Sequence, residues 1–164
     1  MKRLYLIGGP MGVGKTTVGQ LLKRRLPRCV YLDGDWCWDM DPFQVTDATR
    51  TMVLDNISAL LRNFLACPDL ENVVFAWVMH QQAILDRLRE SLADTEAEWT
   101  ALSLVCTPAE LRARLERDVA AGLRQADVIP RSLAYLPLYD ALDTRKLSVT
   151  GLTPEETARA ILQL

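Results

Sequence analysis

The feature that most constrains the fold is a glycine-rich segment near the start of the chain. Residues 9–16 have the sequence Gly-Pro-Met-Gly-Val-Gly-Lys-Thr, which fits the pattern GxxxxGK[ST] in full. An apolar run, Leu4–Ile7, precedes it, and Val18, Leu21 and Leu22 follow it at helical spacing. In the order strand, loop, helix, such a segment turns successive backbone N–H groups toward phosphate oxygens. The chain is therefore predicted to bind a nucleoside triphosphate.

The residues of this phosphate loop have distinct predicted roles. Lys15 is expected to reach the β and γ phosphates, and the Thr16 hydroxyl to complete the shell of a Mg²⁺ ion. The alternative is a glycine-rich turn with a surface lysine, and it is disfavoured because pattern and context agree. The predicted nucleotide-binding residues are Gly9, Gly12, Val13, Gly14, Lys15, Thr16 and Thr17.

Apolar runs and helical patterns alternate along the rest of the chain. Four further strands are expected, at Cys29–Leu32, Val73–Met79, Leu102–Val105 and Lys146–Val149. Helices are expected between them at 47–67 and 84–92, and after the Thr-Pro-x-Glu start signals at Thr107 and Thr153. This order predicts an α/β, three-layer domain with a five-stranded, mostly parallel sheet. Its ligands would bind beyond the carboxyl ends of the strands.

Length and charge limit the possible classes of protein. The 164 residues suit a single domain spanning 1–164. A net charge of −2 provides no basic field for nucleic acid or anionic lipid, and no apolar stretch is long enough to span a membrane. We expect the protein to be cytoplasmic, to be a monomer or homodimer, and to have a small molecule as its partner. Cys29, Cys37, Cys67 and Cys106 form no CxxC pair, which predicts buried, reduced thiols.

A second motif, Leu32-Asp33-Gly34-Asp35, follows the second predicted strand. With the phosphate loop, it makes nearly the whole chain resemble the P-loop small-molecule kinases, among them shikimate, gluconate, adenylylsulfate and chloramphenicol kinases. The resemblance implies a nucleotide-kinase-like P-loop NTPase fold with a short lid, and ATP and Mg²⁺ as cofactors. It also implies that an aspartate of the Asp-x-Asp signature lies near the acceptor hydroxyl or the metal.

The two aspartates are predicted catalytic residues. Separated by one residue in extended backbone, their side chains point the same way. Asp35 is expected to orient the acceptor and take its proton, and Asp33 to lie nearer the metal, although these roles could be exchanged. The alternative is an Asp-Gly turn with solvated carboxylates.

Aromatic residues after these aspartates suggest a substrate pocket. Trp36, Trp38 and Phe43 could form its wall, or they could belong to the core. His80, the only histidine, follows the third strand and could contact substrate or simply begin a helix. With Asp35, the predicted substrate-binding residues are Trp36, Trp38 and His80.

The segment 112–131 is predicted to form the lid. Its arginines are Arg112, Arg114, Arg117, Arg124 and Arg131. Arg117-Asp118 followed by Gly122-Leu123 is similar to the lid of adenylylsulfate kinases, which implies that Arg117 and Arg124 neutralise the transferred phosphoryl group. The alternative for any one arginine is a solvated helix pair, as Glu110 and Arg114, four residues apart, could form. The same resemblance implies that residues 143–151 border the adenine.

Three functions are compatible with these patterns. The leading hypothesis is an ATP-dependent kinase that phosphorylates a hydroxyl of a small metabolite or antibiotic through Lys15, Asp33, Asp35 and the lid arginines. A nucleoside or nucleotide kinase is the nearest alternative. The third possibility is a nucleotide-binding sensor with slow ATPase activity. The third strand carries no aspartate at its end, which disfavours a motor or switch ATPase.

Overall fold

Strands and helices alternate through residues 1–164, all of which are described by the computed structural model. The strands are β1 (Lys2–Gly8), β2 (Cys29–Asp33), β3 (Asn72–Ala76), β4 (Ala97–Val105) and β5 (Arg145–Ser148). The α-helices are α1 (Lys15–Arg25), α2 (Asp47–Ala66), α3 (Gln82–Ser91), α4 (Pro108–Ala120), α5 (Val128–Tyr135) and α6 (Pro154–Leu162). Two 3₁₀ helices, η1 (Gly34–Trp38) and η2 (Leu136–Ala141), complete the chain.

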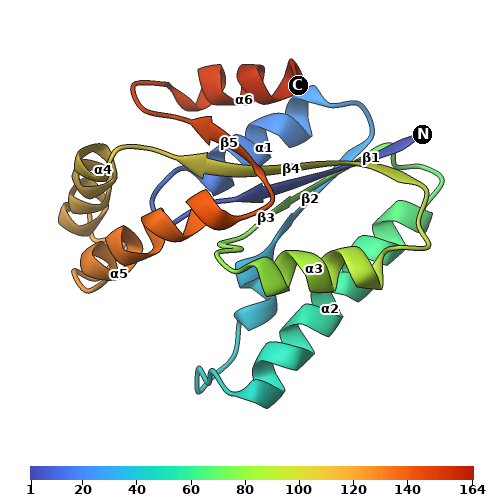
Figure 1. Ribbon diagram of the computed structural model, residues 1–164, viewed down its shortest axis with the longest axis horizontal. Helices are drawn as coiled ribbons and strands as arrows, with labels where there is room; N and C mark the ends of the chain where they lie inside the picture. Colours follow the sequence, from blue (N-terminus) through green and yellow to red (C-terminus); the bar gives the residue numbers. More distant parts are fainter.

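The five strands form one parallel sheet in the order β2-β3-β1-β4-β5. Helices α1 and α6 cover one face and α2 and α3 the other, while α4 and α5 lie at the end toward which the strands point (Figure 1). The prediction of a three-layer α/β domain with a mostly parallel sheet is confirmed, and all the strand pairs are in fact parallel.

The β1 strand shows why the sheet needs helices on both faces. Its side chains alternate between two apolar clusters, with Tyr5 and Ile7 in the cluster toward α1 and α6, and Leu4 and Leu6 in the cluster toward α2 and α3. All four are buried, and removing such a side chain from water contributes about 1.5–3 kcal/mol. A continuous apolar run is thus what a central parallel strand requires.

The third strand is shorter than predicted. We expected Val73–Met79, but β3 ends at Ala76. The apolar residues continue past Ala76 because Trp77 and Val78 lie beside the end of β1 and the start of the phosphate loop. The Trp77 N–H donates to the Ile7 carbonyl, and the Gly9 N–H donates to the Val78 carbonyl. Met79 turns the chain with a φ of 35°.

The predicted lid is divided between two helices. Residues 112–131 comprise most of α4, a connection at 121–127 and the start of α5. Neither α5 nor η2 was expected from the sequence. The starts of α4 and α6 agree with prediction, since Thr107 and Thr153 each accept a hydrogen bond from the N–H of the glutamate three residues on.

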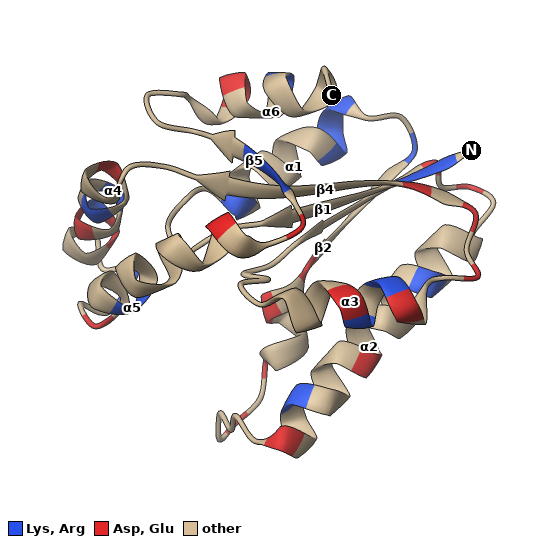
Figure 2. Ribbon diagram, in the orientation of Figure 1, with Lys and Arg blue, Asp and Glu red and all other residues tan.

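The remaining composition-based expectations have mixed outcomes. All four cysteines are free thiols, but only Cys106 is buried and the others are half-buried. Acidic and basic residues are interspersed along the helices of the ribbon (Figure 2). None of the helices combines the length and apolar character needed to cross a lipid bilayer.

Candidate active site

The phosphate loop connects β1 to α1 and leaves the start of that helix open to an anion. Gly14 precedes α1 with a φ of 107°, which glycine adopts without steric cost. No side chain caps this helix, and its first turn has no acidic residue, whereas α4 and α6 have both. The unpaired N–H groups and the positive end of the α1 dipole are therefore available to phosphate.

Four carbonyl groups of the loop accept hydrogen bonds from side chains of the protein. Lys15 Nζ donates to the carbonyls of Gly9 and Pro10 at 2.7 and 2.8 Å. The Met11 carbonyl accepts from buried Ser132 Oγ at 2.6 Å, and the Val13 carbonyl accepts from Arg114 at 3.1 Å. With its carbonyls occupied, the loop can direct its N–H groups toward an anion.

Lys15 lies in an environment that disfavours its charge. Burial lowers its pKa to about 8, nearby Asp35 and Asp33 oppose this change, and Arg124 adds to it. An anionic ligand at the loop would favour the ammonium form and raise the pKa again.

Asp33 is held in one orientation at the end of β2. Its Oδ2 accepts from the Thr16 hydroxyl at 3.2 Å and the Tyr31 hydroxyl at 3.1 Å, while Oδ1 accepts from the Asp35 N–H at 3.0 Å. Asp33 is buried, yet it borders the phosphate pocket. A hydroxyl and a carboxylate so close together are hard oxygen donors that fit Mg²⁺. No group of three or more His, Cys, Asp or Glu side chains forms a metal site, so phosphate and water oxygens would complete the shell.

Asp35 is the second residue of η1 and lines the same pocket. Burial and the charge of Asp33 raise the pKa of its carboxyl, and Lys15 and the Trp77 indole oppose this change. The residue between the two aspartates must be glycine, because a Cβ on Gly34 would lie 2.3 Å from the Trp77 ring. The indole therefore packs directly against the turn that presents Asp35.

These side chains line one pocket of about 400 Å³. Lys15, Thr16, Asp33 and Asp35 border it, together with Gly12, Gly14 and Thr17 of the predicted nucleotide-binding set. Gly9 and Val13 do not line it: Gly9 supports Lys15 through its carbonyl, and the Val13 side chain is buried in the core.

The lid contributes three arginines to this pocket. The predicted pair, Arg117 and Arg124, both line it, and Arg124 Nε donates to Asp118 Oδ2 at 3.0 Å. Arg114, which was not singled out from the sequence, lines it as well. At the place where β3 ends, the lining residues are Ala76 and Trp77, so no carboxylate lies there.

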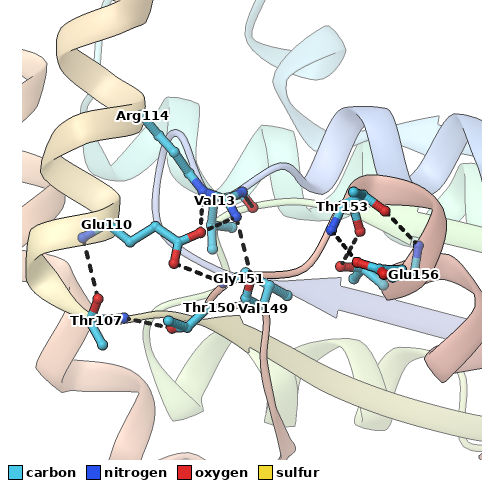
Figure 3. A network of polar contacts seen from close by, with 10 residues as sticks. Val13, Thr107, Glu110, Arg114, Val149, Thr150, Gly151, Thr153 and Glu156 are labelled. Carbon is cyan, nitrogen blue, oxygen red and sulfur yellow. Dashed lines mark hydrogen bonds and ion pairs between the residues drawn. The ribbon is translucent and has the colours of Figure 1, made fainter.

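Arg114 connects the phosphate loop to the segment after β5 (Figure 3). Its guanidinium donates to the Val13 carbonyl at 3.1 Å and the Val149 carbonyl at 3.3 Å, and it pairs with Glu110 at 2.6 Å. Glu110 in turn accepts from the Gly151 N–H at 3.0 Å, and the hydrogen bond from Arg114 lowers its pKa. Arg114 therefore stabilises the loop geometry.

The predicted substrate residues are only partly brought together. Trp38 and His80 line one largely apolar cavity of about 430 Å³. Trp36 does not line it: the residue is 56% exposed, its ring packs edge-on against Tyr31, and it borders an outer hollow with Asp35, Trp38 and Phe43. Val149, in the segment 143–151, is linked to the phosphate loop through Arg114, which donates to the carbonyls of both Val13 and Val149.

Sequence reasoning missed Arg114, Trp77 and Tyr135. Strand register could have indicated Trp77, since Asp33 pairs with Ala76 and the next residue must then lie beside Gly34. Tyr135 lies on the unpredicted α5. The spacing of Glu110 and Arg114 indicated a solvated helix pair; the pair forms, but it is mostly buried and Arg114 also reaches the phosphate loop.

A family model described as an AAA domain matches residues 6–125, which include the phosphate loop, both aspartates and the three arginines of the pocket. The chain belongs to this AAA domain family. No curated protein shows significant sequence similarity to it.

Solved structures share the fold of this AAA domain protein at low sequence identity. A gluconokinase from Sinorhizobium meliloti 1021 superposes with a TM-score of 0.69 and 20% identity, covering 98% of this chain and 90% of its own. The tunicamycin resistance protein of Deinococcus radiodurans gives 0.69 and 20%, with coverages of 99% and 95%. The APS kinase of Mycobacterium tuberculosis, solved with AMPPNP and APS, gives 0.65 and 14%, with 99% and 96%. The resemblance to P-loop small-molecule kinases is thus confirmed at the level of fold.

Proposed function

We propose that the protein is an ATP-dependent kinase that transfers the γ-phosphoryl group to a hydroxyl of a small molecule. The proposal rests on one observation: side chains from the phosphate loop, the end of β2 and the lid line a single pocket. They are Lys15, Thr16, Asp33, Asp35, Arg117 and Arg124. These are the groups that phosphoryl transfer needs, because its catalysis rests on positioning and charge stabilisation.

Each group has a role in the proposed reaction. The loop N–H groups and Lys15 bind the β and γ phosphates, and Thr16 and Asp33 hold a Mg²⁺ ion. That ion supplies positive charge to the phosphate oxygens. Asp35 takes the proton of the acceptor hydroxyl while the acceptor oxygen bonds to the γ phosphorus. The bond between the γ phosphorus and the β,γ-bridging oxygen breaks, and ADP leaves.

The lid arginines complete this arrangement. Arg117 and Arg124 neutralise charge on the transferred group, and Arg124 exchanges its contact with Asp118 for phosphate when the lid closes. The kinases with the same fold, one of them solved with AMPPNP, support a nucleotide at this pocket.

Two alternatives are less well supported. A nucleotide acceptor needs cationic side chains for a second set of phosphates. The three pocket arginines lie instead on the lid, beside the phosphate loop. For a sensor that hydrolyses ATP, the end of β3 is unfavourable: where many P-loop ATPases have a carboxylate that holds Mg²⁺, this chain has Ala76 and Trp77.

The test is phosphoryl transfer from MgATP to a panel of hydroxylated small molecules, followed by ³¹P NMR. We expect one acceptor class to be phosphorylated. Asp35→Asn should lower kcat by about 10²–10⁴-fold without weakening nucleotide binding, as expected for loss of a general base. Asp55→Asn, an exposed carboxylate paired with Arg87 on another surface, is the matched control. Release of phosphate only to water would contradict the kinase proposal and favour the sensor.

A further inference from the structure

A second cavity lies next to the phosphate pocket and differs from it in chemistry. It has a volume of about 430 Å³ and is lined by side chains from η1, α2, α3, α5 and the segment after β3. Its walls are mostly aromatic and aliphatic: Trp38, Leu54, Trp77, Val78, Ile84 and Tyr135. Such a cavity favours a ligand with a flat, apolar body.

His80 is one of the few polar residues in these walls, with Arg50 and Gln81. Its ring stacks on Tyr135, with centroids 4.4 Å apart and planes at 7°. The Nδ1 atom is buried and has no hydrogen-bond partner. Burial also lowers the pKa of His80, so the imidazole is neutral at neutral pH. A buried nitrogen without a partner is destabilising, and a hydrogen bond from a ligand would remove that cost.

The backbone fixes His80 in this position. The Val78 carbonyl accepts from the Tyr139 hydroxyl at 2.6 Å, and Met79, which is buried, turns the chain with a φ of 35°. The imidazole is therefore presented at the carboxyl end of β3 by a defined turn.

The charges around the cavity disfavour an anionic ligand. The only cationic side chain in its lining is Arg50, which is 62% exposed and already lies 3.4 Å from Asp47. The lid arginines line the phosphate pocket instead. A carboxylate or phosphate placed in this cavity would lose its hydration without gaining a buried partner.

Two tryptophans connect this cavity to Asp35. Trp77 lines both the cavity and the phosphate pocket, and Trp38 lines both the cavity and the outer hollow that Asp35 borders. A molecule whose body occupies the cavity can therefore extend a hydroxyl past the indoles toward the Asp35 carboxyl.

We propose that this cavity binds the phosphoryl acceptor, and that the acceptor is an uncharged molecule with a flat apolar body. One hydroxyl or amide pairs with His80 Nδ1, and a second hydroxyl reaches Asp35. The role of the second hydroxyl rests on the proposed kinase function, whereas binding in the cavity does not.

Isothermal titration of the full chain without nucleotide tests the binding. The probes are 1-(2-naphthyl)ethane-1,2-diol, which is neutral, 2-naphthylglycolate, its carboxylate counterpart, and erythritol, which has no ring. We expect the diol to bind at least tenfold more tightly than either comparison compound. His80→Ala should weaken the diol about tenfold, the equivalent of one hydrogen bond, and His80→Asn should restore part of that loss.

A cavity-filling pair of variants separates occupancy from folding. Leu54→Trp places an indole in the cavity and should abolish diol binding, whereas Met52→Trp, on the exposed side of the same helix, should leave it intact. Equal effects of the two variants, tighter binding of the glycolate, or failure of the diol to bind would overturn the proposal. If the diol binds in this pattern but MgATP phosphorylates no member of the hydroxylated panel, the cavity assignment holds and the kinase proposal fails.

Discussion

At the scale of single residues, the surroundings of Lys15 suit the binding of an anionic ligand. Two loop carbonyls accept hydrogen bonds from its ammonium group, while burial lowers its pKa to about 8. Phosphate oxygens would replace those carbonyls and favour the charged form. Nucleotide binding and protonation of Lys15 should therefore be coupled.

We predict that nucleotide affinity falls with rising pH. Below pH 8 the ammonium is already formed and the affinity of AMPPNP should be constant. Above pH 8 the free protein must take up a proton to bind, so the affinity should fall by up to roughly tenfold per pH unit until the pKa of the complex is reached. Titration calorimetry between pH 6.5 and 9.5 measures this. Lys15→Arg, which keeps its charge over that range, should remove the dependence, and a flat profile for the natural protein would contradict the coupling.

Arg114 should matter for stability as well as for the site. Arg114→Ala removes the donors to the Val13 and Val149 carbonyls, and we expect a loss of about 2 kcal/mol in the free energy of unfolding, or about 4–8 °C in Tm. Nucleotide affinity should fall too, since the loop loses a support. Arg112→Ala, an exposed arginine on the same helix, is the control for thermal unfolding. Equal shifts in Tm for both variants would argue against the Arg114 network.

The sequence indicated Lys15, Thr16 and the two aspartates because a local pattern carries their chemistry. The spacing of Glu110 and Arg114 indicated a helix ion pair, but it could not show that Arg114 also binds the carbonyls of Val13 and Val149. Those hydrogen bonds depend on contacts between segments far apart in the chain.

At the scale of elements, helix starts were predicted well and helix continuations less well. The two Thr-Pro-x-Glu signals begin α4 and α6 as expected, because caps are local hydrogen bonds. The α5 helix was not predicted. Its Pro130 lies in the first turn, where the absent N–H is not needed. The end of β3 was misjudged because apolar residues continue past Ala76 into the turn that presents His80.

The cap of α6 provides a test at this scale. Thr153 and Glu156 form a reciprocal capping box, and the helix packs Ala158 and Ile161 into the core beside α1. Thr153→Ala should lower the free energy of unfolding by about 1 kcal/mol, which is about 2–4 °C in Tm. Thr51→Ala, an exposed position within α2, should leave Tm unchanged or slightly higher. Chemical denaturation of both variants decides between a cap effect and a general effect of losing threonine.

At the scale of the whole molecule, the fold followed from the alternation of strands and helices, whereas the shape of the lid did not. The lid lies at the end of the sheet with α4 and α5, and its connection at 121–127 is exposed, with Leu123 75% accessible (Figure 1). Only the three-dimensional arrangement shows that the lid arginines face the phosphate loop.

We predict that nucleotide protects this connection from proteolysis. In the free protein, trypsin should cleave after Arg124, which is partly exposed and paired only with Asp118. MgAMPPNP should slow that cleavage several-fold, because Arg124 becomes engaged with phosphate as the lid closes. Mass spectrometry of the fragments identifies the site, and Arg124→Gln should remove it. Unchanged cleavage with saturating nucleotide would mean that the lid does not close on this ligand.

The Val78 carbonyl has a consequence for the timing of the proposed reaction. It accepts the Gly9 N–H of the phosphate loop at 3.3 Å and the Tyr139 hydroxyl at 2.6 Å, while the Val78 side chain borders the apolar cavity. One peptide group thus connects the phosphate loop to the apolar cavity. The relative placement of these two binding sites is set when the chain folds, so the entropy of aligning the two sites is lost before either reactant binds. Each encounter would then begin from the same relative placement of the two binding sites.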